Sequence, residues 1–172
     1  MTGRRRTALV AAGAVVAVVL AVAAFRPAGD DDPAPPGAAP AITTTDLEGR
    51  RVSLSEYEGR PVLLNFWASW CVPCRSEFPL FKEVDGTQVD VLGVVFDDQR
   101  GPAADFMEDQ GATWPGLLDP GGRIARAYGV ARRPGIPVTI AIDRAGRIAD
   151  RQIGEAGREE LDRLVAAARR PT

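Results

Sequence analysis

The strongest constraint on this sequence is a pair of cysteines, Cys71 and Cys74, placed directly after a run of apolar residues. The 172-residue chain has no other cysteine. A spacing of two residues at the start of a helix lets the sulfurs close a small disulfide ring. It also leaves Cys71 nearest the helix N-terminus, where unpaired backbone N–H groups favour a thiolate. We therefore expect Cys71 to be the attacking sulfur and Cys74 its resolving partner, unless the pair is a static disulfide.

Composition removes several classes of function. The chain has no histidine, which is the commonest metal ligand and the commonest general base. Two cysteines cannot complete a four-thiolate zinc site, so we expect neither a structural metal nor a cofactor. Beyond residue 26 the chain carries 17 basic against 23 acidic residues, a net charge of −6, and its arginines are scattered. This balance argues against nucleic acid as a partner.

The first 40 residues differ in composition from the rest. Residues 1–26 contain four arginines and no acid, and a helix over the 18 uncharged residues 8–25 would span roughly 27 Å. The arginines before this run and the aspartates at 30–32 after it place the N-terminus inside and the remainder outside. We expect residues 1–26 to anchor the chain in a membrane, with a signal segment cleaved near the Ala-Val-Ala at 21–23 as the alternative. The five prolines of residues 27–40 predict an extended linker.

Residues 41–172 suit one α/β domain. The continuous apolar run 62–68 predicts a strand buried on both faces. The cysteine pair follows at its carboxyl end, where active sites of open α/β sheets collect. The other predicted elements, in chain order, are a β-hairpin near 42–54, a helix at 74–84 kinked at Pro79, a strand at 89–96, a helix at 103–110, a short extended or turn segment at 114–119, a helix at 122–128, a hairpin of strands 138–143 and 147–153, and a helix at 158–169.

Three ordered motifs resemble the thioredoxin-like thiol–disulfide oxidoreductases, and within them the ResA/TlpA/DsbE type. They are residues 65–79 around the cysteine pair, residues 118–122 leading to 127–130, and residues 135–139 before 142–143. The resemblance covers about residues 41–170. It implies a thioredoxin fold, which is a central mixed sheet with helices on both faces, here with an N-terminal β-hairpin and a helical insert around 97–130.

The resemblance also implies a substrate-binding wall opposite the cysteines. Pro137 matches the family's cis-proline, which faces the dithiol and leaves the backbone of Ile136 beside Cys71. That backbone could pair with an extended substrate strand with little demand on its sequence. Trp70 precedes the attacking cysteine, where an aromatic side chain shields the disulfide and shapes the substrate groove.

Glu77 matches the family's active-site glutamate. Its spacing of three residues from Cys74 puts its carboxylate on the same face of a helix, able to take that thiol's proton. In thioredoxins proper a buried aspartate occupies the place held here by Asn65. The absence of that aspartate favours Glu77 as the proton carrier.

We therefore expect thiol–disulfide exchange with Cys71 and Cys74 as the redox-active disulfide. The expected reaction is reduction of partner disulfides such as those of apocytochrome c. It would take place on the extracytoplasmic face of the membrane, or outside the cell if the signal is cleaved. A membrane protein of the CcdA/DsbD type would supply the electrons. The first alternative is an oxidase that forms disulfides in secreted proteins. The non-enzymatic alternative is a metallochaperone that binds its ion with two thiolates. A static disulfide is disfavoured, because so small a ring restrains little of the unfolded chain.

Overall fold

The computed structural model describes residues 37–130 and 135–171. The predicted membrane anchor at 1–26 and residues 27–36 of the predicted linker lie outside the described residues. Within the two described ranges, no helix has the length and hydropathy needed to cross a membrane. Residues 37–40, the end of the predicted linker, lie on the domain, since the Ala39 amide donates to the Gly146 carbonyl at 2.8 Å and the Tyr128 hydroxyl donates to the Pro40 carbonyl at 2.6 Å.

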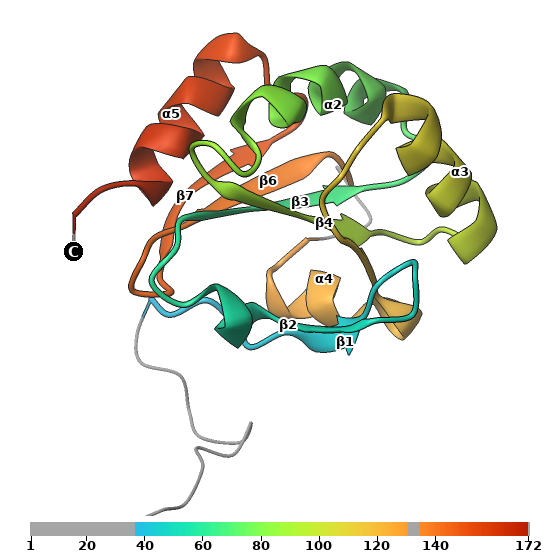
Figure 1. The fold of residues 1–172 in the computed structure, drawn as a ribbon, viewed down its shortest axis with the longest axis horizontal. Coiled ribbons are helices and arrows are strands. Elements are labelled where there is room, and N and C mark those ends of the chain that lie inside the picture. The colour runs from blue at the N-terminus through green and yellow to red at the C-terminus, as the bar shows by residue number, and fades with distance from the viewer. Residues whose placement is uncertain (1–36, 131–134, 172) are drawn as a thin grey trace, which may run out of the picture. The chain divides into compact units, whose positions relative to one another are not determined.

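A five-stranded mixed sheet forms the centre of the domain (Figure 1). Its order is β5-β4-β3-β6-β7, with β3 parallel to β4, β4 parallel to β5, and β6 antiparallel to both β3 and β7. Every residue of β3 is buried, which confirms the prediction of a strand covered on both faces. The strands are β3 (Val62–Trp67), β4 (Asp90–Val95), β5 (Gly116–Leu118), β6 (Val138–Ile142) and β7 (Ile148–Ile153).

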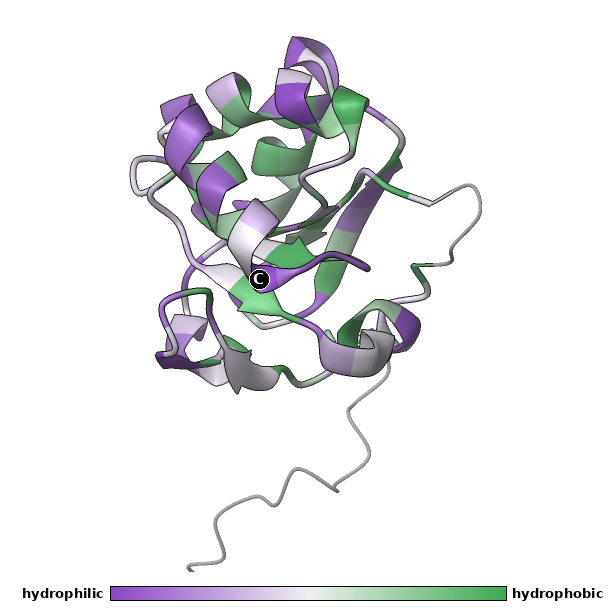
Figure 2. Ribbon diagram, turned by 90° about the vertical axis from the view of Figure 1, so that its right-hand side faces the viewer, coloured by the Kyte–Doolittle hydropathy of each residue, from purple (hydrophilic) through white to green (hydrophobic). Residues whose placement is uncertain are grey.

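Helices cover both faces of the sheet, as predicted. Figure 1 shows α2 (Val72–Val84), α3 (Arg100–Gln110) and α5 (Arg158–Ala168) on one face. The short α4 (Arg123–Ala127) and the hairpin of β1 (Thr43–Thr45) and β2 (Arg51–Ser53) lie on the other, with the 3-10 turns η1 (Leu54–Tyr57) and η2 (Pro120–Gly122) as connections. Each face has its own buried apolar cluster. The helices carry both hydrophilic and hydrophobic segments, as expected for helices with one face on a core (Figure 2).

Side chains of β3 alternate between the two clusters. Leu63 and Trp67 pack in the cluster under α2, α3 and α5, whereas Leu64 and Phe66 pack in the cluster under α4 and the hairpin. Because successive side chains of a strand point to opposite faces, Asn65 belongs to the face covered by α2. This places one polar strand residue on the side where the cysteine-bearing helix lies.

Two helices begin earlier than predicted. The helix after the cysteines starts at Val72, two residues before the predicted start, and α3 starts at Arg100, three residues before it. Each has a proline in its first turn, Pro73 and Pro102, where the missing N–H would have no acceptor within the helix. The segment predicted as a helical insert also contributes a strand, β5, at the edge of the sheet.

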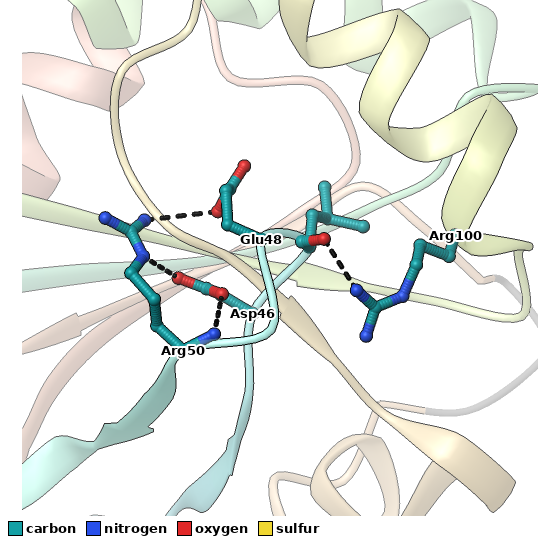
Figure 3. Close-up of polar contacts among 5 residues, drawn as sticks. Asp46, Glu48, Arg50 and Arg100 are labelled. Atoms are coloured by element: carbon teal, nitrogen blue, oxygen red, sulfur yellow. Dashed lines mark hydrogen bonds and ion pairs between the residues drawn. The ribbon is translucent and has the colours of Figure 1, made fainter.

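The turn of the N-terminal hairpin is fixed to its neighbours by charged groups (Figure 3). Asp46 is fully buried and accepts hydrogen bonds from the backbone amide and the Nε of Arg50, each at 2.7 Å. Arg50 also pairs with Glu48 at 3.1 Å, and Arg100 of α3 donates to the Leu47 carbonyl at 2.7 Å. Burial raises the pKa of Asp46, but the bonds from Arg50 outweigh burial and hold it below its ordinary value.

Candidate active site

The two cysteines form a disulfide at the N-terminus of α2, directly beyond the carboxyl end of β3. Cys71 is the N-cap of the helix, and the backbone amide of Cys74 donates to its Sγ at 3.3 Å. A thiolate at this position keeps that hydrogen bond and gains from the positive end of the helix dipole. Cys74 is fully buried while Cys71 is 4% exposed, so Cys71 is the sulfur that a partner can reach.

The Ile136–Pro137 peptide bond is cis, as the family resemblance implies. Strand β6 begins at the next residue, and Val138 lies opposite Phe66 near the end of β3. Ile136 is partly buried and packs against the apolar cluster that contains both cysteines. The structure therefore brings Ile136 and Pro137 to the dithiol end of the sheet, and their contact with a substrate stays a prediction.

Large apolar side chains are exposed around this end of the sheet. Trp70 is 58% exposed, Val72 between the cysteines is 79% exposed, and Ile153 at the end of β7 is 58% exposed. Ile153 lies opposite Val138, the residue that follows the cis-proline. Within the described part of the chain these are the large hydrophobic residues that remain exposed, so the rim of the disulfide is the apolar surface of the domain.

A groove of about 850 Å³ begins at Trp70. Its other walls are the β4–α3 loop at 96–99, the segment 118–122 and Arg126 of α4. Trp70 Nε1 donates to the Asp97 carbonyl at 3.3 Å, and the Ser69 amide donates to Asp98 Oδ2 at 2.7 Å, so the loop before Cys71 is fixed to this wall. Trp70 therefore lines this groove next to Cys71 in the sequence, and the shielding of the disulfide and the contact with a substrate that were expected of it stay predictions.

Glu77 lies on the core side of α2, one turn beyond Cys74, and both residues are buried. Its Oε1 accepts the Ala156 amide at 2.7 Å, and its Oε2 accepts Asn65 Nδ2 at 3.4 Å. Burial raises the pKa of Glu77 from its ordinary 4.5 to about 8, against these two hydrogen bonds, which lower it. A pKa of about 8 brings this carboxyl toward the ordinary pKa of a cysteine thiol, ~8.5, as suits a group that exchanges protons with thiols.

The sequence analysis named Asn65 only as the residue in place of a buried aspartate, and it missed the hydrogen bonds of Asn65 with Glu77 and Thr139 and the Ala156 amide. Asn65 donates to Thr139 Oγ1 at 2.9 Å, which adds a residue of β6 to the site. Polar residues in the apolar runs of β3 and β6 are the signal that could have found this pair. The Ala156 amide is a backbone group that lies 79 residues from Glu77, so no side-chain pattern indicates it.

Comparison with known proteins agrees with this geometry. Residues 36–151 match the AhpC/TSA family. Thiol-disulfide oxidoreductase ResA of Bacillus thuringiensis (strain Al Hakam) is 32% identical over 128 residues, which cover 72% of each protein. ResA of Geobacillus kaustophilus (strain HTA426) is 33% identical over 129 residues, covering 73% of this chain and 72% of that one.

Solved structures share the fold. A putative thiol:disulfide interchange protein DsbE from Chlorobium tepidum superposes with a TM-score of 0.66 at 32% identity, covering 76% of this chain and 94% of that one. The structure of MTB dsbF in its mixed oxidized and reduced forms gives a TM-score of 0.69 at 26% identity, covering 80% of this chain and all of that one. The chain therefore belongs to the AhpC/TSA family and is a thiol–disulfide oxidoreductase of the ResA/DsbE type with a thioredoxin-like fold.

Proposed function

We propose that this protein reduces disulfides in protein partners outside the cytoplasm, with apocytochrome c as a substrate, and that its N-terminal segment holds it at the membrane. The observation that carries this proposal is the environment of Cys71. Its Sγ receives the amide of Cys74, while Pro73 supplies no N–H. The nearby cation Arg75 lies over the Phe106 ring, 4.7 Å from its centroid. A strong oxidant needs a heavily stabilised thiolate, and this modest donor set favours the reducing direction.

Reduction of a partner proceeds in two exchange steps. The Cys71 thiolate attacks one sulfur of the partner disulfide, that S–S bond breaks, and the displaced partner sulfur takes up a proton. Cys74 then gives its proton to Glu77, and its thiolate attacks Cys71 Sγ. The mixed disulfide breaks, the second partner sulfur leaves as a thiolate that takes up a proton from water or from Glu77, and the protein keeps the Cys71–Cys74 disulfide. Two electrons have passed from the protein to the partner.

The proposed location of the protein, outside the cytoplasm and at the membrane, supports the proposed substrate and electron donor. Outside the cytoplasm general disulfide formation oxidises thiols, and the haem-attachment cysteines of apocytochrome c must be thiols to react. The exposed apolar rim of Trp70, Val72 and Ile153 suits an unfolded polypeptide with apolar side chains. A membrane protein of the CcdA/DsbD type would return electrons to the oxidised disulfide, and a tethered domain would meet it at high effective concentration.

Trapping of the mixed disulfide tests the partner. The Cys74→Ser variant lacks the resolving thiol and should accumulate apocytochrome c bound to Cys71, released on treatment with a reductant. Cys71→Ser is the matched control, since it keeps one cysteine but removes the accessible one, and it should capture nothing. Absence of apocytochrome c among the captured proteins would reject this substrate. Recovery of the intact chain in the soluble fraction of cells would reject the tether.

The direction of electron flow is tested by the equilibrium of the Cys71–Cys74 pair with glutathione buffers. We expect a reducing potential, near the thioredoxin end of the range at ~−270 mV. A potential near the DsbA end, ~−120 mV, would reject reduction and favour the alternative, an oxidase that forms disulfides in secreted proteins.

A further inference from the structure

We propose that Asn65 and Thr139 form a reversible hydrogen-bond pair that holds Glu77 in both of its protonation states, which makes Asn65 a positioning residue for the proton transfer from Cys74. This inference rests on the proposed role of Glu77 as proton carrier. It assigns a task to two buried polar side chains that the exchange chemistry itself does not use.

The placement of the pair is set by the sheet. Asn65 of β3 and Thr139 of β6 lie directly opposite each other in the antiparallel register, and each is 1% exposed. The other residues of both strands are apolar, with Asn65 and Thr139 as their polar members. Burial of an amide and a hydroxyl is costly unless both are hydrogen-bonded, so an apolar pair here would be cheaper for stability alone.

The two polar atoms of the Asn65 amide differ in their hydrogen bonds. Its Nδ2 donates to both Thr139 Oγ1 and Glu77 Oε2, at 2.9 Å and 3.4 Å. Its Oδ1 is buried and has no partner within the described residues. The Asn65 amide therefore donates to Glu77 when Glu77 is a carboxylate, and its Oδ1 is an acceptor that has no partner in this state.

Protonation of Glu77 reverses what that group needs. When the proton of Cys74 moves to Glu77 Oε2, the new O–H becomes a donor and requires an acceptor. The terminal torsion of asparagine is roughly two-fold, so a half-turn exchanges Nδ2 for Oδ1 at the same place. Oδ1 then accepts a hydrogen bond from the Glu77 O–H, and Nδ2 moves to the place where Oδ1 had no partner. One proton has moved from Cys74 to Glu77 with no change in the number of charges.

Thr139 makes the half-turn possible because a hydroxyl both donates and accepts. It accepts from Asn65 Nδ2 while Glu77 is charged and donates to Oδ1 once Glu77 is neutral. An aspartate in place of Asn65 would instead put a second carboxylate beside Glu77. The charged or titratable groups around Glu77 are Glu155 of the loop before α5, which raises its pKa, and the two cysteines at the start of its own helix.

The test follows the second exchange step directly. In the full-length protein, Cys71 is converted to a mixed disulfide with thionitrobenzoate, and release of the coloured thiolate reports the attack of Cys74. We expect Asn65→Leu and Thr139→Val to slow this release about tenfold, the rate equivalent of about one hydrogen bond, and to displace its pH profile. Thr139→Ser restores the hydroxyl and should release within about twofold of the unmodified protein.

The first exchange step supplies the control. In a Cys74→Ser background, Asn65→Leu and Thr139→Val should leave the attack of Cys71 on a small aromatic disulfide within about twofold of its reference rate. Equal slowing of both steps, or failure of Thr139→Ser to rescue Thr139→Val, would show a structural effect and overturn the proposal. If Asn65→Leu does not fold, the Thr139 variants decide alone.

Two results separate this inference from the proposed function. If Glu77→Gln slows release while both strand variants keep the rate and pH profile of the unmodified protein, Asn65 and Thr139 have no positioning role and Glu77 keeps its own. If Glu77→Gln releases at the full rate, Glu77 is not the proton carrier and this inference fails with it, whereas the proposed reduction of partner disulfides is decided separately by trapping and by the redox potential. Infrared difference spectra add a readout that packing does not move, since the C=O stretch of protonated Glu77 should shift upward in Asn65→Leu, where its O–H lacks an acceptor. An unshifted band would overturn the pair.

Discussion

Replacement of Glu77 by glutamine is expected to stabilise the oxidised protein at alkaline pH. Burial raises the pKa of Glu77 from 4.5 to about 8 in the folded protein, whereas the unfolded chain returns it to its ordinary value. Between these two pKa values the folded state binds a proton that the unfolded state has lost. The free energy of unfolding of the unmodified protein therefore falls as pH rises through this window, and levels off above the folded pKa.

The magnitude follows from the width of the window. Each pKa unit is worth about 1.4 kcal/mol, so a shift from 4.5 to about 8 corresponds to an upper value of ~5 kcal/mol. Glutamine keeps an oxygen for the Ala156 amide, and a half-turn of the Asn65 amide brings its unpartnered Oδ1 to the place of Nδ2, where it accepts the glutamine N–H. We expect the variant to lie within ~1 kcal/mol of the unmodified protein near pH 5 and to be ~3 to 5 kcal/mol more stable near pH 9.

Urea unfolding of the oxidised protein at intervals from about pH 5 to about pH 9 measures this difference. Neither histidine nor cysteine titration contributes to stability in this pH range, because the chain has no histidine and both cysteines are held in the disulfide. Glu83→Gln is the matched control: this glutamate lies on the same helix, its side chain is 56% exposed, and it pairs with Arg158 at 2.6 Å. Its loss should change stability by ~1 kcal/mol or less across the range. Parallel curves for Glu77→Gln and the unmodified protein would refute the claim that burial raises the pKa of Glu77.

Two further predictions concern packing and the hairpin. Gly93→Ala should destabilise the protein by ~1 to 3 kcal/mol in urea, because its Cβ would lie 2.6 Å from Trp67 Nε1, whereas Gly101→Ala, whose Cβ meets nothing within 4 Å, should be neutral or slightly stabilising. Similar costs for the two would contradict the packing argument. Asp46→Ala should cost ~1 kcal/mol near neutral pH because the backbone amide of Arg50 loses its acceptor. Burial raises the Asp46 pKa but the Arg50 bonds lower it further, so the cost should shrink in acid as the carboxylate protonates, and a cost independent of pH would reject this account.

The sheet and its helices could be predicted because burial leaves a pattern along the chain. The continuous apolar run of β3 indicates a strand covered on both faces, and the structure buries all of it. The position of the cysteines then follows from the rule that α/β sites lie at the carboxyl ends of strands. The sequence alone does not indicate that the short segment containing β5 pairs with β4 in the sheet. Strand β5 has three residues and begins at Gly116, which is a weak strand former.

Tertiary contact, not local preference, makes β5 a strand. Gly116 lies opposite Gly93 of β4, and its carbonyl accepts the Leu47 amide at 2.9 Å from the hairpin. A Cβ at Gly116 would lie 2.5 Å from Leu47 Cδ1 and 2.7 Å from the sulfur of Met107, so the glycine permits the hairpin and α3 to close over this edge. The sequence predicts an extended or turn segment at 114–119, which contains β5, but the pairing of that segment with β4 and the reason for the glycine depend on segments distant in sequence.

The site shows the same limit for a different reason. Helical spacing predicts that Glu77 lies on the face of Cys74, yet it does not predict that a carboxylate will be buried, because stability alone would exclude one. The structure buries it with help from Asn65, Thr139 and the Ala156 amide, which come from three separate segments. The burial that weakens the fold above neutral pH also raises the Glu77 pKa to about 8, close to that of a thiol. If Glu77 is the proton carrier, as proposed, a pKa raised toward that of an ordinary thiol suits a proton transfer that must run in both directions as disulfides exchange.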